Sequence, residues 1–149
     1  MIRLDVPWVP PSSNKAYFNK RGGGGRMLST EGRKFKTATT THFAQKYPAQ
    51  MMFFKPNLPY LIVMRFYFDD VETKGFATGK AEARYKVFDG GNRTKLLEDC
   101  LKDAGGIDDS QTLISIWQKE KSSPERTTIW AWSLEEEACE LYELVRSLA

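Results

Sequence analysis

The run of apolar residues from Tyr60 to Phe68 alternates with the two-residue period of a β-strand. One face of this strand consists entirely of large apolar side chains, which are those of Ile62, Met64, Phe66 and Phe68. The opposite face is mostly apolar too, so the pattern predicts a largely buried, central strand. Residues 2–6 predict a shorter strand that ends at Pro7, because proline cannot donate a hydrogen bond to a neighbouring strand.

Two segments are predicted to form helices, the first from its capping residue and the second from a capping residue and the 3.6-residue period. Ser29 is a suitable N-cap for a helix that runs towards Tyr47. A second helix is predicted from Arg93 to Asp103, with Asn92 as its cap. Its apolar positions recur at i, i+3, i+4 and i+7, and they are Leu97, Cys100, Leu101 and Ala104.

The C-terminal third predicts two strands, Leu113 to Lys119 and Arg126 to Trp132, which we expect to pair antiparallel across a polar turn. Ser133 and Glu136 form a capping box before a final amphipathic helix. The expected order is therefore β-α-β-α-β-β-α, an α/β (α+β) fold with a mixed β-sheet flanked by helices. We expect one domain over residues 1–149, since this length and 41% hydrophobic content suit a single core.

Two polar, glycine-containing segments interrupt this pattern and carry cations. The first surrounds the four glycines of residues 22–25, and its cations are Lys20, Arg21 and Arg26. We expect a mobile basic loop there. The second runs from Asp69 to Lys86 and predicts a long loop or ribbon, and its cations are Lys74, Lys80, Arg84 and Lys86.

Charge is distributed unevenly along the chain. Residues 1–50 hold nine Lys and Arg against two Asp and Glu, whereas the whole protein has a net charge of only +3. A basic face of this kind suits a polyanion, most commonly nucleic acid, although a solvated basic surface fits the charge equally well. Cys100 and Cys139 have no partner at metal-ligand or redox spacing, and no signal peptide or membrane span is recognisable. We therefore expect a soluble, intracellular protein.

Acidic residues stand at both ends of the second predicted helix. Asp89 precedes this helix, and Asp108 and Asp109 follow it. An eleven-residue helix is about 16 Å long, so only the fold decides whether its ends approach one another. Simple turns explain these residues equally well, and the pair Asp69–Asp70 is a rival. Lys95 lies in the expected first turn, where the helix dipole disfavours a cation, so it has either a functional role or an ion pair with Asp99.

Residues 88–111, FDGGNRTKLLEDCLKDAGGIDDSQ, resemble the core motif of the RusA family of Holliday junction resolvases. The matching positions are Asp89, Asn92, Lys95, Asp99 and Asp108–Asp109. PWVPPSSNKAY at residues 7–17 is similar to the family's proline-rich opening, and LSTEGRKF at residues 28–35 is similar to the entry of its first helix. The three blocks stand in the family's order. Gly91 departs from the pattern, because the family commonly has a metal-binding acidic residue there.

The resemblance implies an Mg²⁺-dependent endonuclease, with Mn²⁺ as a possible substitute, that cuts branched DNA such as four-way junctions as a homodimer. It assigns catalysis to Asp89, Lys95 and Asp109, and metal binding to Asp89, Asp109 and, as a weaker candidate, Asp108. The expected DNA contacts are Lys20, Arg21, Arg26, Lys74, Lys80, Arg84, Lys86, Phe88 and Arg93. A cytoplasmic protein of bacterial or phage origin is expected on the same ground.

Two other functions remain open. The first is a non-catalytic dimer of the same fold that binds branched DNA and has lost cleavage through Gly91. The second is a metal-dependent enzyme that acts on a small phosphate ester, which fits the carboxylates but gives the basic loops no role.

Overall fold

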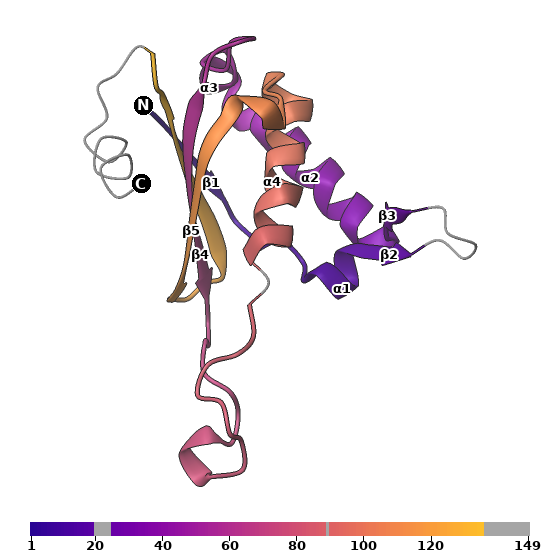
Figure 1. Ribbon diagram of the computed structural model, residues 1–149, viewed down its shortest axis with the longest axis vertical. Coiled ribbons are helices and arrows are strands. Elements are labelled where there is room, and N and C mark those ends of the chain that lie inside the picture. The colour runs from indigo at the N-terminus through magenta and orange to yellow at the C-terminus, as the bar shows by residue number, and fades with distance from the viewer. Residues whose placement is uncertain (20–24, 89, 136–149) are drawn as a thin grey trace.

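The computed structural model describes residues 1–19, 25–88 and 90–135, with only the backbone at Ser13 and Asp109 (Figure 1). Four strands form one mixed sheet in the order β1-β6-β4-β5. Their bounds are Ile2–Val6 for β1, Tyr60–Phe68 for β4, Thr112–Lys121 for β5 and Arg126–Ser133 for β6. The predicted α/β class and the central position of the strand from Tyr60 to Phe68 are therefore confirmed.

The predicted pairing between the last two strands is wrong. β4 lies between them, pairing parallel with β5 and antiparallel with β6. β4 thus has a neighbouring strand on each side, and its mostly apolar side chains on both faces suit such an interior position. A parallel neighbour requires a crossover rather than a hairpin, and the helix between β4 and β5 makes that crossover.

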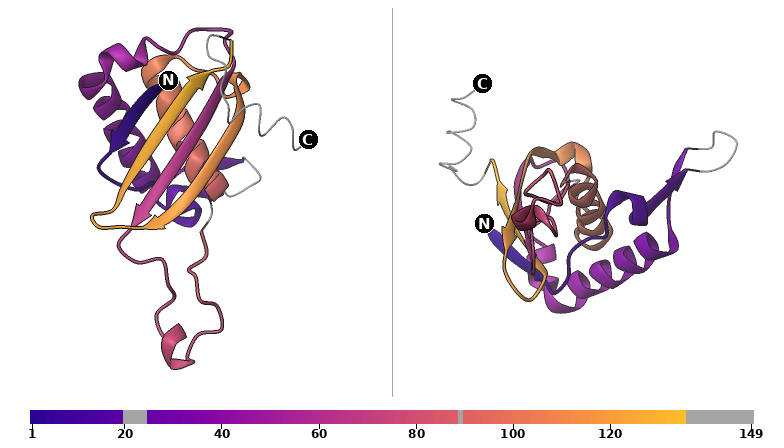
Figure 2. Two further views of the ribbon diagram at one scale, coloured as in Figure 1. Left: turned by 90° about the vertical axis from the view of Figure 1, so that its left-hand side faces the viewer. Right: turned by 90° about the horizontal axis from the view of Figure 1, so that it is seen from below.

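Two long helices, α2 (Thr30–Lys46) and α4 (Gly90–Gly105), cover one face of the sheet (Figure 2). Ser29 is the N-cap of α2, and its hydroxyl accepts a hydrogen bond from the backbone of Gly32, as predicted. Two short helices, α1 (Ser13–Ala16) and α3 (Pro48–Met51), were not predicted. Two 3₁₀ turns, η1 (Phe76–Thr78) and η2 (Asp109–Gln111), complete the helical segments of the described residues.

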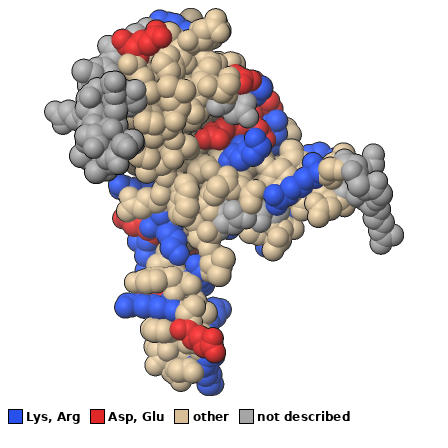
Figure 3. All heavy atoms as spheres, viewed as in Figure 1, with Lys and Arg blue, Asp and Glu red and all other residues tan. Residues whose placement is uncertain are grey.

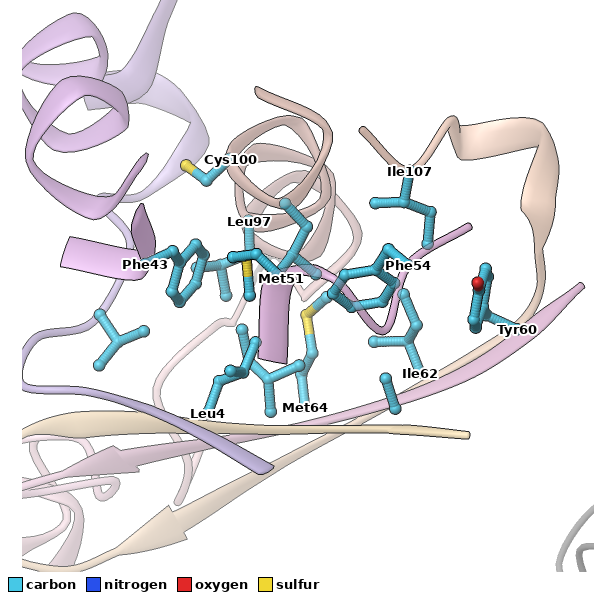
Figure 4. Packing of buried hydrophobic residues seen from close by; sticks show 14 of the residues in the cluster. Leu4, Phe43, Met51, Phe54, Tyr60, Ile62, Met64, Leu97, Cys100 and Ile107 are labelled. Atoms are coloured by element: carbon cyan, nitrogen blue, oxygen red, sulfur yellow. The ribbon is translucent and has the colours of Figure 1, made fainter. Parts of the chain in front are cut away.

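The core lies between β4 and the two long helices (Figure 4). The face of β4 that was predicted to be apolar supplies Ile62, Met64 and Phe66, which are fully buried. Leu97, Cys100 and Leu101 of α4 are fully buried as well, so the apolar positions assigned to this helix are confirmed. Burial is the main cause that raises the pKa of the Cys100 thiol to about 12, which keeps it neutral.

Two projections leave this body. We call residues 69–87 the arm; the backbone N–H of Thr73 donates to the carbonyl of Arg84, and Glu72 forms an isolated bridge with Tyr85. Its tip is the turn η1, flanked by two glycines with positive φ, Gly75 and Gly79. The second projection is the hairpin of β2 (Tyr17–Asn19) and β3 (Arg26–Leu28), which was predicted only as a loop. The arm extends beyond the end of the sheet where β4 ends (Figure 1).

Some predictions lie outside the described residues. They concern Cys139, the final helix after Ser133 and the loop cations Lys20 and Arg21. Ser133 is the last residue of β6.

Replacing Leu97 with alanine removes buried methyl groups between α4 and β4, so we expect the free energy of unfolding to fall by about 2–5 kcal/mol. Lys95→Ala is the control, because Lys95 lies two residues earlier on the same helix and is exposed. It should change stability by less than about 0.5 kcal/mol. Urea denaturation measures both variants, and equal losses would contradict the position of Leu97 in the core.

Candidate functional site at the start of α4

An aromatic cluster supports the first turn of α4. The Phe88 ring packs with its centroid 5.1 Å from that of Trp117 and 5.2 Å from that of Phe66. Gly90, the first residue of α4, lies directly against Trp117, because a Cβ added there would fall 2.3 Å from its ring. Asp89 stands between these two anchored residues and lies outside the described residues.

Arg93 links this turn to the N-terminal segment. Its guanidinium carbon lies 5.2 Å from the centroid of the Phe88 ring and 5.5 Å from that of Phe68. It also donates a hydrogen bond to the carbonyl of Pro10. The predicted DNA contacts by Phe88 and Arg93 stay predictions, and both side chains are half-buried by contacts within the protein.

Asn92 does not cap α4 as predicted, because the helix begins two residues earlier and Asn92 is its third residue. Its side-chain oxygen instead accepts a hydrogen bond of 3.1 Å from Arg26 of the hairpin. The Arg26 guanidinium carbon also lies 4.7 Å from the centroid of the Tyr17 ring. The base of the hairpin is therefore held against the first turn of α4 by residues 66 positions apart in sequence.

Tyr17 is a residue whose role the sequence did not indicate. Its hydroxyl is buried without a hydrogen-bond partner among the described residues. Burial, and secondarily the Asp99 carboxylate, raise the pKa of Tyr17, whereas Arg26 opposes them. An open pocket of about 400 Å³ lies here, lined by Asn14, Tyr17, Phe18, Asn19 and Arg26.

Lys95 is exposed and is the sixth residue of α4. It therefore lies in the second turn rather than the first, which corrects the prediction. The early start of the helix at Gly90 is the reason, and it weakens the expected conflict with the helix dipole, which acts mainly within the first turn.

Asp108 lies at the other end of α4. Its carboxylate pairs with Lys102 of the last turns at 2.5 Å. Asp109 begins η2, and its side chain lies outside the described part. With 16 residues, α4 is about 24 Å long. Because β4 and β5 are parallel, Gly90 and Asp108 lie at opposite ends of the sheet, and one chain does not bring them together.

Two of the four predicted DNA-contacting cations of the arm lie beside acidic partners. Lys86 pairs with Asp70 at 3.2 Å, and Arg84 pairs with Glu72 at 3.0 Å. A backbone hydrogen bond from Glu72, and then Lys86, lower the pKa of Asp70. The rival pair Asp69–Asp70 thus supplies a structural ion pair at the base of the arm. The other two cations of the arm, Lys74 and Lys80, make no ion pair with any described residue.

Figure 3 shows Lys and Arg on both the arm and the hairpin, on the face of the molecule where α4 begins. Among the side chains that the structure describes, no three His, Cys, Asp or Glu gather as metal ligands. Asp89 and the side chain of Asp109 lie outside the described part of the chain. No helix within the described residues is long and apolar enough to cross a membrane.

Gly91 has open space around it. A Cβ added there would meet nothing within 4 Å, and its φ is not positive. The position that lacks the acidic residue of the resembled pattern can therefore accept a side chain.

A protein-family model described as Endodeoxyribonuclease RusA matches residues 7–130. This range includes every position proposed for the site. No curated protein matches the chain significantly.

The two adjacent glycines predict opposite responses to alanine. Gly90→Ala would force Trp117 and α4 apart, so we expect a loss of about 1–3 kcal/mol in the free energy of unfolding. Gly91→Ala should be neutral or stabilise by up to about 1 kcal/mol, because alanine favours the helix and meets no neighbour. Urea denaturation of both variants measures this difference. Equal tolerance at the two positions would show that Trp117 does not pack against the helix start.

Proposed function

Because the chain belongs to the RusA family of endodeoxyribonucleases, we propose that it is an Mg²⁺-dependent homodimeric endonuclease. It resolves Holliday junctions and other branched DNA by paired, symmetric cleavage of phosphodiesters. The observation that carries this proposal is the Arg26–Asn92 hydrogen bond. This hydrogen bond joins the cationic hairpin to the first turn of α4. The arm also ends at the start of α4, so both projections meet there.

Asp89 and Asp109 are the proposed ligands of the cation, and Asp108 is a weaker candidate. Carboxylates fit Mg²⁺ because it prefers oxygen ligands, and Mn²⁺ is a possible substitute. When bound, such an ion offsets charge on the phosphoryl oxygens and lowers the pKa of a coordinated water. The exposed Lys95 ammonium would contact the scissile phosphate and stabilise its charge in the transition state.

The length of α4 makes the dimer part of this proposal. Gly90, next to Asp89, and Asp108, next to Asp109, lie at opposite ends of a helix about 24 Å long. No carboxylate side chain spans that distance. A second chain related by a two-fold axis supplies the missing carboxylate, and it also gives the two cleavage sites that symmetric cutting needs.

The DNA backbone would be held by cations of the two projections, which are Lys20, Arg21, Arg26, Lys74, Lys80, Arg84 and Lys86. Lysine and arginine bind phosphates without regard to sequence, so specificity for a junction comes from the spacing of these contacts. A phage or prophage origin and a cytoplasmic location stay predictions of the resemblance.

A non-catalytic dimer that binds branched DNA is the second candidate. Gly91 favours it, because this chain lacks one acidic residue of the family pattern. Mg²⁺-dependent nicking of a synthetic junction distinguishes the two candidates.

Asp89→Asn and Asp109→Asn should abolish cleavage of a synthetic four-way junction while junction binding survives. Each variant removes a ligand's charge but leaves the cations of the arm and hairpin in place. Lys95→Ala should lower the cleavage rate by orders of magnitude. Gel assays with and without Mg²⁺ measure cleavage, and band shifts measure binding.

Asp103→Asn is the matched control for these variants. Asp103 lies on the same helix and pairs with Lys36 at 2.9 Å, so its loss should leave cleavage nearly unchanged. Full cleavage by the Asp89 or Asp109 variant would overturn the assignment of the ligands.

Gly91→Asp should lower the Mg²⁺ concentration that gives half-maximal cleavage. The added carboxylate would raise the negative charge of the site, and the open space at Gly91 accommodates it. A magnesium titration of the wild type and the variant, with Gly91→Asn as an uncharged control, measures the shift. An unchanged midpoint in a folded variant would show that position 91 does not face the metal.

A further inference from the structure

The two edges of the sheet are treated differently. At the β1 edge, the backbone N–H of Asp5 donates to the hydroxyl of Tyr47 at 3.0 Å. The Asp5 carbonyl lies 2.9 Å from the ring nitrogen Nε2 of His42, and it also accepts from the Tyr47 hydroxyl. His42 of α2 and Tyr47, which follows it, thus occupy the outward backbone groups of Asp5 at this edge.

The β5 edge has no such cover within the described residues. β5 is ten residues long and pairs on one side only, with β4. No described residue bonds the outward backbone groups of Thr112–Lys121. An uncovered edge of this length is a template for another strand.

The first six residues of β5 also lack the usual protection of an edge. From Thr112 to Trp117 the strand has no charged residue and no proline. Leu113 is 60% exposed and Trp117 is 43% exposed. By contrast, the short β1 edge carries the Arg3–Asp5 ion pair. The apolar half of β5 is therefore suited to contact with another surface.

We propose that the β5 edge is the dimer interface, where a second copy of the chain pairs antiparallel about a two-fold axis at Ser115. This inference rests on the homodimer of the proposed function and identifies its surface. The pairing would join two four-stranded sheets into one, with α4 of both copies on the same face.

The sequence of β5 is self-complementary in this register. Ser115 lies opposite Ser115 of the other copy, Ile114 opposite Ile116, and Leu113 opposite Trp117. An axis at Trp117 would instead place Leu113 opposite Lys121, so apolar matching selects Ser115.

Charge favours the same antiparallel arrangement. Asp108 and Asp109 precede β5, whereas Lys119 and Lys121 lie near its end. Antiparallel pairing brings the cationic end of each strand alongside the acidic start of the other, whereas parallel pairing would align like charges. It also brings the start of one β5 to the end of the joint sheet where α4 of the other copy begins.

Ser115→Cys tests the register directly. When a residue lies directly opposite the same residue of the other copy, the two Cα atoms are about 4.5–5.5 Å apart. This distance is within the range of a disulfide bond. In a Cys139→Ser background, mild oxidation should give a covalent dimer on non-reducing gels, since Cys100 is buried. Gln118→Cys is the control. In this register Gln118 lies opposite Thr112, so the two copies of Gln118 are six residues, or about 20 Å, apart along the strands. Failure of Ser115→Cys to cross-link, or equal cross-linking of both variants, would overturn the interface.

Leu113→Lys tests the same surface without a cross-link. The substitution should raise the dissociation constant of the dimer at least tenfold. Light scattering should then detect monomers of 17.1 kDa. Met52→Lys, at a residue that is 80% exposed at the end of α3, should leave the dimer intact. A wild type that is monomeric at micromolar concentration, or a Leu113→Lys variant that stays dimeric, would contradict the interface. Junction cleavage is measured separately, so loss of this interface and loss of the proposed activity are distinguishable.

Discussion

The crossover from β4 through α4 to β5 determines where the proposed metal ligands, Lys95 and the arm lie. Parallel strands require a connection that returns along the whole sheet, and here α4 makes that return. The core residues Leu97, Cys100 and Leu101 hold α4 on the sheet, and the contact between Gly90 and Trp117 sets the position of its first turn. The same crossover separates the two acidic ends of α4, which is why a single chain leaves the proposed metal site incomplete.

The electrostatics of the arm follow from this geometry. The arm leaves the end of β4 and returns to the start of α4, so its base lies beside the proposed site. Two of its four predicted DNA-contacting cations, Arg84 and Lys86, are paired with carboxylates. These pairs are exposed and contribute little to stability, so they can exchange their carboxylate for a phosphate. Lys74 and Lys80, near the tip, are the cations of the arm that would meet DNA without first losing an ion pair within the described structure.

Sequence patterns predicted the elements that are marked by local periodicity or by a capping residue. Periodicity predicted the strand β4 and the apolar positions of α4, and the preference of serine for N-caps predicted the role of Ser29. The structure confirms all three. Pairing and contact between distant segments were not accessible in this way. The predicted antiparallel pair of β5 and β6 was wrong because β4, which is distant from both in sequence, lies between them in the sheet. Asn92 was expected to cap α4 because asparagine is a good N-cap residue, but the helix begins two residues earlier, at Gly90. Nothing local indicates that Arg26, 66 residues earlier, donates to the Asn92 side chain.

We propose above all that this protein makes paired cuts in branched DNA and that it needs Mg²⁺ to do so. A supercoiled plasmid that extrudes a cruciform tests it most directly, because two symmetric cuts in one binding event yield a linear product, whereas independent nicks yield an open circle first. Linear plasmid is expected from the start of the time course, only with Mg²⁺ or Mn²⁺. The same plasmid without the cruciform should not be cleaved. Absence of cleavage at any metal concentration, or equal cleavage of both plasmids, would contradict it.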